Sequence, residues 1–210
     1  MRSIVGILLG LSISLFACNS VEHKNINTDS TTKKISVGES KLTIGPKFLI
    51  IPGVSIGQIK LGEDTQEIGN KLGTPDAGDA AMGKAWSIWY SEDPNTTRRN
   101  ELSIYSSYKD SSATSKDVKQ IRITSGQFKT LDGFGTGRKL KDAQAKFPDL
   151  DQISTYLNEK KDTVLIYDSK SQGIGFEFLS GKSISLTVHP KNVSVNATYL
   201  AIHPDWKLVN

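Results

Sequence analysis

A glycine-rich segment at residues 132–139 has the composition of a ligand-binding loop. Its sequence is DGFGTGRK, and it lies between a strand-like stretch and a predicted helix. Glycines leave backbone N–H groups accessible, and cations at the start of a helix can hold a phosphate or another anion. The spacing lacks the final offset of a dinucleotide-binding loop. Two interpretations stay open: an anion site formed by Gly135, Gly137, Arg138 and Lys139, or a structural turn that opens the helix.

Two further motifs contain residues found in catalytic or phosphate-binding sites, but their spacing favours a structural role. Ser106 and Lys109 have the Ser-x-x-Lys spacing of serine acyl enzymes. Here they fall in a predicted strand, where residues three apart point to opposite faces. Five residues separate Gly175 from Gly181, whereas a phosphate-binding loop has four. We therefore predict a hairpin turn at Ser180–Lys182.

The three histidines and one cysteine leave little material for metal or redox chemistry. A single cysteine forms no internal disulfide, no thiolate zinc cluster and no Cys-x-x-Cys pair. His189 and His203 each follow an apolar stretch and precede a proline, so they could share a metal ion, or His203 could pair with Asp205. Turns at the ends of strands explain both histidines more simply. We expect no enzyme activity, no metal ion and no cofactor.

The overall composition is that of a folded globular chain. Its 210 residues are 37% hydrophobic, 23% charged and 8% aromatic, which leaves room for one domain or two small ones. The net charge of +4 is too small to predict a nucleic-acid partner. The composition leaves the oligomeric state open.

The chain begins with a positively charged start followed by an apolar stretch. Met1 and Arg2 precede Ile4–Phe16, which is apolar apart from small residues. This stretch is too short to span a bilayer as a helix, for which about 20 residues are needed, so it indicates a signal peptide. The only cysteine of the chain, Cys18, lies two positions beyond it.

The residues Leu15-Phe16-Ala17-Cys18 resemble the lipobox of bacterial lipoproteins. The resemblance implies that residues 1–17 are removed and that Cys18 carries acyl chains such as palmitate, which anchor the protein in a membrane. The alternative is a soluble secreted protein with a stray thiol. The lipoprotein interpretation predicts a location in the cell envelope, with the outer membrane favoured over the inner one and the periplasmic or surface face left open.

Residues 18–42 are predicted to be a flexible tether. After Cys18 they are polar and mixed in charge, and such a segment cannot bury enough apolar surface to fold alone. His23 lies in this stretch and is predicted to be part of the spacer. The tether would hold a globular body away from the membrane.

An internal repeat organises the rest of the chain. Residues 56–76 and 131–149 align at an offset of 75 positions, so that Gly62 matches Gly137 and Leu72 matches Phe147. Each copy predicts one short amphipathic helix after its glycine, and Pro75 and Pro148 mark the helix ends. The sequence thus predicts an α+β fold of two tandem units, 43–128 and 129–210, each with a short helix packed on a small antiparallel sheet.

Stretches with alternating or apolar character predict the strands that follow each helix. Ile174, Phe176 and Phe178 alternate with other residues, as expected for a sheet with one buried face. The predicted strands are 85–90, 102–108 and 118–124 in the first unit, and 154–157, 163–168, 174–178, 184–188 and 199–202 in the second.

The first unit resembles the SmpA/OmlA family of small envelope lipoproteins. The resemblance rests on Ile59-Lys-Leu-Gly62, Ile68, Leu72-Gly73-Thr-Pro75 and the aromatic stretch Trp86–Tyr90. The second unit keeps Gly137 but has Phe147-Pro148 in place of Leu-Gly. Two such units in tandem are similar to the fold of the β-lactamase inhibitor protein. The resemblance implies a binding module of the cell envelope without catalytic machinery.

A set of aromatic and arginine side chains is the predicted contact surface. If the aliphatic positions of the first three strands face the helix, then Trp89, Tyr105 and Arg122 share the open face. Such residue types are enriched at binding hot spots. The alternative is that this face packs against the second unit.

Two functions from different classes are compatible with the sequence. The leading hypothesis is a membrane-anchored, non-catalytic accessory or scaffold protein that binds an envelope protein partner. The alternative is a lipoprotein that binds a small ligand, a lipid or a glycan, in a cavity between sheet and helix. An enzyme would need serine, histidine and acidic side chains that only the fold could bring together.

Overall fold

The computed structural model describes residues 44–91, 99–198 and 200–209, and the structural statements below refer to these ranges. Cys18, the predicted signal peptide and the predicted tether with His23 lie outside them. No helix in the described ranges is long and apolar enough to cross a membrane.

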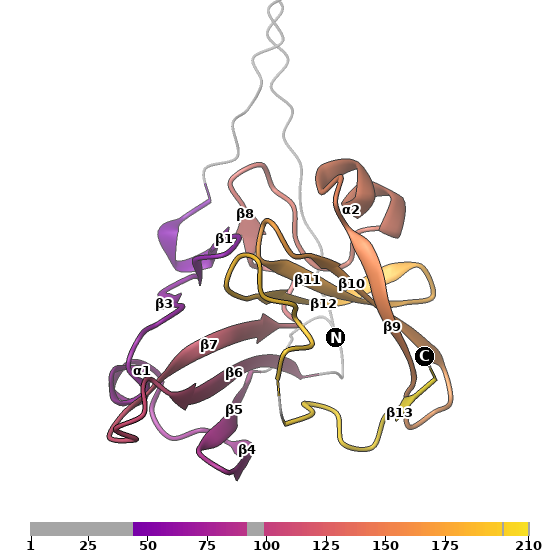
Figure 1. The fold of residues 1–210 in the computed structure, drawn as a ribbon. Helices are drawn as coiled ribbons and strands as arrows, with labels where there is room; N and C mark the ends of the chain where they lie inside the picture. Colours follow the sequence, from indigo (N-terminus) through magenta and orange to yellow (C-terminus); the bar gives the residue numbers. More distant parts are fainter. Residues whose placement is uncertain (1–43, 92–98, 199, 210) are drawn as a thin grey trace, which may run out of the picture. The chain divides into compact units, whose positions relative to one another are not determined.

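A nine-stranded antiparallel sheet forms most of the structure (Figure 1). Its strand order is β13-β9-β10-β11-β12-β7-β6-β5-β4, so strands from both halves of the chain meet where β12 pairs with β7. The strands are β4 (Ala77–Ala81), β5 (Lys84–Ser91), β6 (Asn100–Tyr108), β7 (Lys116–Ile123), β9 (Asp151–Leu157), β10 (Thr163–Ser169), β11 (Ile174–Leu179), β12 (Lys182–Val188) and β13 (Lys207–Leu208).

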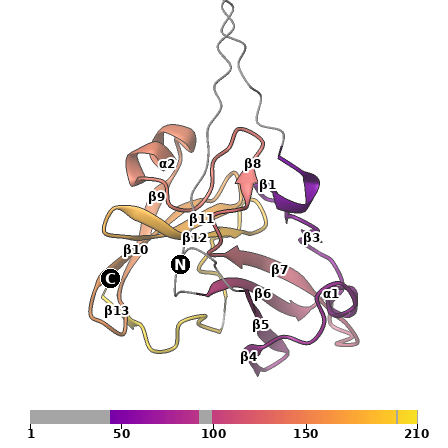
Figure 2. The ribbon, with the colours of Figure 1, turned by 180° about the vertical axis from the view of Figure 1, so that it is seen from behind.

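A second, smaller sheet has the order β3-β2-β1-β8. Its β1 and β8 run parallel, and the two views in Figures 1 and 2 both show them side by side. A single turn of 3-10 helix, η1, precedes β1. These short elements are η1 (Pro46–Phe48), β1 (Leu49–Ile51), β2 (Ser55–Ile56), β3 (Ile59–Lys60) and β8 (Lys129–Thr130).

The two predicted helices are confirmed and have the expected ends. In α1 (Thr65–Leu72), the side chain of Asp64 accepts a hydrogen bond from the backbone N–H of Gln66, and Gly73 ends the helix with a φ of 75°. Glycine adopts this left-handed conformation without strain. Helix α2 (Leu140–Lys146) ends just before Pro148.

Gly62 and Gly137, which the repeat aligns, have closely similar local geometry. Their φ angles are 76° and 82°. The N–H of Gly62 donates to the carbonyl of Val118 at 2.8 Å, and that of Gly137 donates to the carbonyl of Ser183 at 2.9 Å. Each glycine therefore lies between a short strand of the small sheet and its helix, and its N–H is bonded to a strand of the large sheet. The tandem repeat itself remains a prediction.

The predicted α+β class is wrong, because the described structure is mainly β. It contains thirteen strands and two α-helices of eight and seven residues. Helices this short cover little of a nine-stranded sheet; the small sheet packs into the core on one face, and the C-terminal chain lines a cavity on the other. The boundary between 43–128 and 129–210 remains a prediction.

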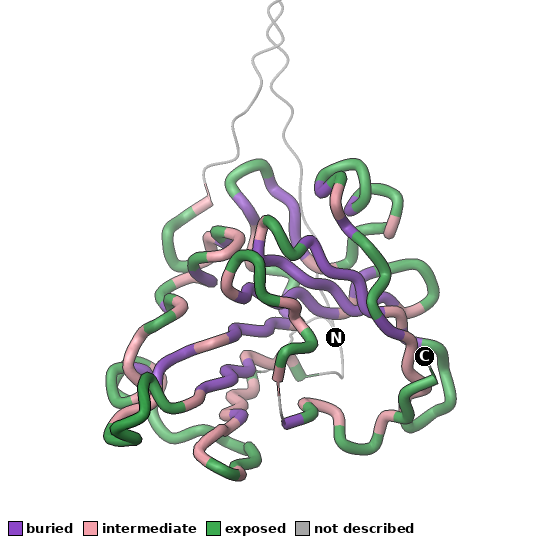
Figure 3. Tube along the Cα trace, viewed as in Figure 1, coloured by how far each residue is buried: buried purple, intermediate pink, exposed green. Residues whose placement is uncertain are grey.

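The main hydrophobic core lies between one face of the large sheet, called the core face, and the small sheet with both helices. The core face carries Ile104, Ile121, Ile123, Leu186 and Val188. Figure 3 shows the buried residues along the central strands, whereas the turns are exposed. From the other elements, Ile50, Ile56, Ile59, Ile68, Ala143 and Phe147 pack against it.

The strands predicted from alternation are confirmed except for the last one. Residues 200–202, from the stretch predicted as a strand, contain a bend and no strand, and the final strand is β13 instead. The predicted turn between β11 and β12 is confirmed, since Ser180 and Gly181 both have positive φ angles, 50° and 76°. Two consecutive residues of this kind form the tight turn that fits the twist of a hairpin.

Candidate functional site

The face of the large sheet opposite the core face, called the polar face, carries an unusual set of buried polar side chains. Directly paired residues of neighbouring strands have side chains on the same face. The register pairs Ser103 with Arg122, Arg122 with Thr187, and Ser185 with Glu177. Arg122 is 3% exposed and Glu177 is 7% exposed. The hydroxyls of Ser103 and Ser185 find no hydrogen-bond partner in the described structure.

Arg122 is the centre of a charged network on this face. Its Nε donates to Oε1 of Glu177 at 2.9 Å, and its Nη2 donates to Oε2 of the same carboxylate at 2.6 Å. Its Nη1 donates to Oε2 of Glu101 at 2.9 Å. Such two-pronged contacts between arginine and a carboxylate are the stronger kind of charged hydrogen bond. The guanidinium is therefore held rigidly, with its charge balanced inside the protein.

The same contacts set the ionisation of both partners. Burial opposes the charged form of Glu177, but the positive charge of Arg122 and the hydrogen bond of His203 outweigh it and hold the pKa of Glu177 far below its usual range. Burial likewise acts against the charge of Arg122, and the carboxylate of Glu177 outweighs it, so the pKa of Arg122 is raised. Both groups are charged at neutral pH.

The C-terminal segment, described at residues 190–198 and 200–206, crosses the polar face. It brings His203 to Glu177, with Nε2 3.3 Å from Oε1. The ring of His203 stacks on that of Trp206 at 3.7 Å with an interplanar angle of 10°. Trp206 also lies 6.3 Å from the ring of Tyr156 on β9. An imidazole and an indole are thus placed directly over the buried ion pair.

A cavity of about 100 Å³ lies between the polar face and the C-terminal segment. Residues of β5, β7, β9, β10, β11 and β12 line one side of it, and the C-terminal segment forms its roof. Its walls combine aromatic rings with hydrogen-bonding groups, as in sites for small molecules. The lining residues include Trp86, Arg122, Tyr156, Glu177, His203 and Trp206.

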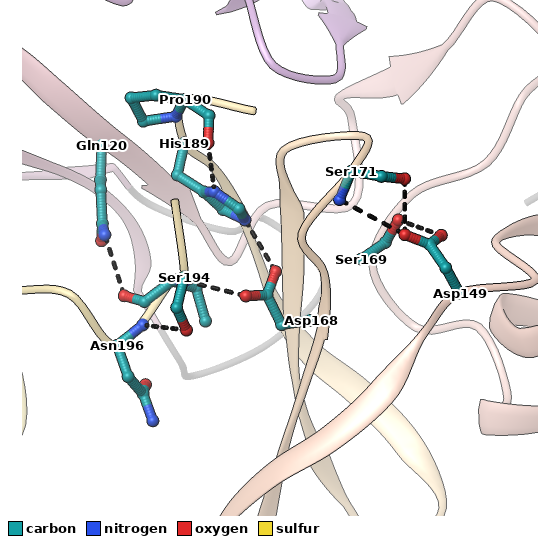
Figure 4. A network of polar contacts seen from close by, with 10 residues as sticks. Gln120, Asp149, Asp168, Ser169, Ser171, His189, Pro190, Ser194 and Asn196 are labelled. Atoms are coloured by element: carbon teal, nitrogen blue, oxygen red, sulfur yellow. Dashed lines mark hydrogen bonds and ion pairs between the residues drawn. The ribbon is translucent and has the colours of Figure 1, made fainter. Parts of the chain in front are cut away.

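A second polar network fixes the roof of this cavity (Figure 4). Asp168 on β10 accepts hydrogen bonds at both carboxylate oxygens, from Nε2 of His189 at 2.8 Å and from the backbone N–H of Val195 at 2.9 Å. The amide of Gln120 on β7 donates to the carbonyl of Val195 at 2.9 Å. Further along, Nε1 of Trp86 donates to the carbonyl of Leu200 at 2.9 Å. The roof is therefore bound to the sheet at several points.

Asp149 forms a separate polar contact at the same end of β10, also visible in Figure 4. Its two carboxylate oxygens accept hydrogen bonds from the hydroxyls of Ser169 and Ser171, each at 2.6 Å. These bonds, that of Ser169 foremost, lower the pKa of Asp149. Asp149 ties the start of β9 to the turn after β10, which is a structural role.

The structure separates the three predicted contact residues. Trp89 lies opposite Leu102, so it lies on the core face, where its Nε1 is 3.3 Å from the carbonyl of Gly73. Tyr105 and Arg122 lie on the polar face, and both are buried. The predicted shared open face is therefore wrong. The physical reason is the strand register: Trp86 lies opposite Tyr105, and their rings are 5.2 Å apart.

The residues of the other predicted sites are also not brought together. His189 binds Asp168 and His203 binds Glu177, so the two histidines belong to different networks. No group of three histidine, cysteine or acidic side chains in the described ranges is arranged to hold a metal ion. Ser106 lies inside β6 as expected, and Lys109 lies just beyond that strand.

The predicted anion segment contains one unexpected neighbour. Gly137 has its positive φ, Lys139 occupies the N-cap position of α2 without a side-chain hydrogen bond, and Nη2 of Arg138 donates to the carbonyl of Gly133 at 3.1 Å. Next to Gly135 lies the side chain of Lys129 from β8. Lys129 is therefore a further cation at this turn, and it lies outside the predicted segment 132–139.

Sequence reasoning missed Glu177, Trp86 and the contribution of His203 to the cavity. One signal was present: Glu177 interrupts an apolar strand, Ile174–Leu179, in which a carboxylate must find a buried partner or leave the strand exposed. The partner, Arg122, lies 55 positions away. Only the sheet register could connect the two.

Comparison of the chain with known protein families, curated proteins and solved structures finds no match. The resemblance to the SmpA/OmlA family therefore remains a prediction.

Proposed function

We propose that this protein is a lipid-anchored lipoprotein of the bacterial cell envelope that binds one unit of a neutral glycan without transforming it. The observation that carries the proposal is the cavity over the Arg122–Glu177 pair, closed by a separate segment of chain. Anchoring through Cys18 is the part of the proposal that rests on the lipobox-like sequence alone.

The charges around the cavity favour a neutral ligand. The guanidinium of Arg122 is already bound by two carboxylates, those of Glu177 and Glu101, so no free positive charge is offered to an anionic ligand. The remaining groups, such as the His203 ring, can donate or accept hydrogen bonds. Hydroxyl groups, which both donate and accept, match such a surface.

The size and the aromatic walls favour a sugar unit over an acyl chain. Sites for drug-sized ligands measure about 300–1,000 Å³, and this cavity of about 100 Å³ holds only a small part of such a molecule. The rings of Trp86, Tyr156 and Trp206 offer apolar faces to the C–H groups of a sugar, while Arg122 and Glu177 lie behind them. A lipid tail would place its methylene groups against a buried ion pair.

The accessory-subunit hypothesis was based on a face shared by Trp89, Tyr105 and Arg122, and these residues do not share a face. Tyr105 and Arg122 are buried, and Trp89 lies on the opposite face of the sheet. No other observation in the described structure singles out an envelope protein as the ligand of this cavity. Partner binding therefore stands second to glycan binding.

Tryptophan fluorescence of the full chain, titrated with a panel of neutral mono- and disaccharides, tests the proposal. We expect a saturable change that Trp206→Leu abolishes and Trp206→Phe retains in part. Trp89→Leu removes an indole from the other face of the sheet and serves as the matched control, which should keep the binding. Equal loss in both leucine variants, no response to any sugar, or a response only to a long-chain detergent contradicts the proposal.

A further inference from the structure

Two cations lie over one turn at the end of the molecule that contains β8 and α2, an end that Figures 1 and 2 both show. Nη2 of Arg138 donates to the carbonyl of Gly133. A β-carbon added to Gly135 would lie 2.7 Å from Cδ and 2.9 Å from Nζ of Lys129, so the lysine chain runs directly across this glycine. Lys129 and Arg138 therefore hold their charges on the same turn.

No carboxylate neutralises this pair in the described ranges. The acidic residue of the turn, Asp132, is engaged elsewhere, since it forms an ion pair with Lys146 and accepts a hydrogen bond from the hydroxyl of Thr130. Burial and, after it, the charge of Arg138 lower the pKa of Lys129. Two like charges on one turn, without a counter-charge, favour the binding of an anion.

The surroundings of the pair favour a phosphate group over a simple halide. An arginine presents several N–H groups in a plane, and a lysine adds a compact charge, so that together they can contact different oxygens of one tetrahedral anion. Gly135 has no side chain to fill the space beside Lys129, and a β-carbon there would also lie 2.5 Å from the carbonyl of Phe128. The absence of a side chain at Gly135 thus leaves room for the lysine.

We propose that Lys129 and Arg138 form a binding site for a phosphate group, supplied either by an anionic phospholipid or by a free phosphate. The site is separate from the cavity and independent of the function proposed for it. Leu131, on the same turn, is 71% exposed. An exposed leucine beside two cations can enter the boundary between headgroups and acyl chains of a membrane. Leu131 should therefore contribute to binding if the phosphate belongs to a phospholipid, and should not contribute if the phosphate is free.

The first arm of the test uses inorganic phosphate and the full chain with Cys18→Ser. We expect saturable NMR shifts of the Gly133 and Gly135 amides, with an affinity that falls at least tenfold in Lys129→Gln and in Arg138→Gln. Lys160→Gln removes the same charge from a distant turn and should leave the affinity unchanged. Thermal unfolding verifies that each variant folds. If the Lys129 variant does not fold, the Arg138 variant still tests the proposal, because Arg138 is exposed.

The second arm uses vesicles of phosphatidylcholine with and without phosphatidylglycerol. The apolar N-terminal stretch should bind both vesicle types equally. We therefore compare the ratio of binding with phosphatidylglycerol to binding without it. A lipid source predicts that Lys129→Gln, Arg138→Gln and Leu131→Ser all lower this ratio, whereas a free phosphate predicts shifts in the first arm and no change in the ratio. Responses in both arms that Lys129 and Arg138 do not affect, or that Lys160→Gln reduces equally, overturn the proposal.

Discussion

Replacing one partner of the buried ion pair should destabilise the protein far more than replacing both. In Glu177→Gln, the guanidinium of Arg122 loses the carboxylate that accepts two of its three hydrogen bonds, at 2.9 and 2.6 Å, and keeps only Glu101. Removing one partner of a buried pair costs about 3–5 kcal/mol. The glutamine oxygen can still accept one hydrogen bond and Glu101 still balances the charge, so we expect the lower end, about 3 kcal/mol.

Arg122→Met should cost more, about 4–5 kcal/mol, because it leaves the carboxylate of Glu177 buried with only His203 beside it. Glu101 is 30% exposed at its side chain and would turn to water at little cost. In the double variant Arg122→Met/Glu177→Leu no charge stays buried between the two positions. Apolar replacements of buried pairs are often neutral or stabilising, so the double variant should be more stable than either single variant.

The pH dependence of stability gives a second readout of the same pair. Glu177 has a pKa far below the usual 4.5 in the folded protein, so its contribution to stability is present above about pH 4.5. As the pH falls below that value, the unfolded chain takes up a proton that the folded protein does not, and the free energy of unfolding decreases. The double variant should lack this part of the decrease.

Urea unfolding followed by circular dichroism, at pH 7 and at steps down to pH 3, measures both effects. The reasoning is refuted if Glu177→Gln costs less than about 1 kcal/mol, the range of an exposed ion pair. It is also refuted if the two single effects simply add in the double variant, because directly bonded groups must show a coupling energy.

Three further changes test the surroundings of the cavity. Asp168→Asn puts an amide donor against either His189 or the N–H of Val195, so we expect a loss of about 1–3 kcal/mol in urea unfolding and faster proteolysis within residues 190–198. Gly173→Ala adds a β-carbon 2.3 Å from the carbonyl of His189 at a φ of 72°, and should lower the melting temperature by several degrees. Asp64→Ala removes the cap of α1 and should cost about 1 kcal/mol in the same unfolding assay.

Local sequence signals predicted the local elements well. The cap at Asp64 and the glycine at 73 define both ends of α1, and the alternation through Ile174, Phe176 and Phe178 defines β11. These signals act within a few residues of each other, so they can be recognised without knowing the fold. The strands of two or three residues in the small sheet are too short to show any period, so their bounds could not be predicted.

The faces of the central strands could not be predicted, because both of them are covered. Alternation distinguishes the two faces only where one of them meets water. In β5 both Trp86 and Trp89 are apolar, and the C-terminal segment buries one while the core buries the other. The contact between Trp86 and Leu200 joins positions 114 residues apart. No pattern within the strand contains that information.

The buried ion pair is best explained by the cavity above it. Stability alone does not account for Arg122 and Glu177, because well-packed apolar residues usually stabilise a fold at least as much. The unpaired hydroxyls of Ser103 and Ser185 on the same face are a further cost to folding. Arg122 and Glu177 line the cavity, so a ligand that needs a rigid, polar floor accounts for both of them. The double variant Arg122→Met/Glu177→Leu therefore separates the two explanations: if it folds as stably as the wild type but no longer responds to sugars, the polar floor serves binding.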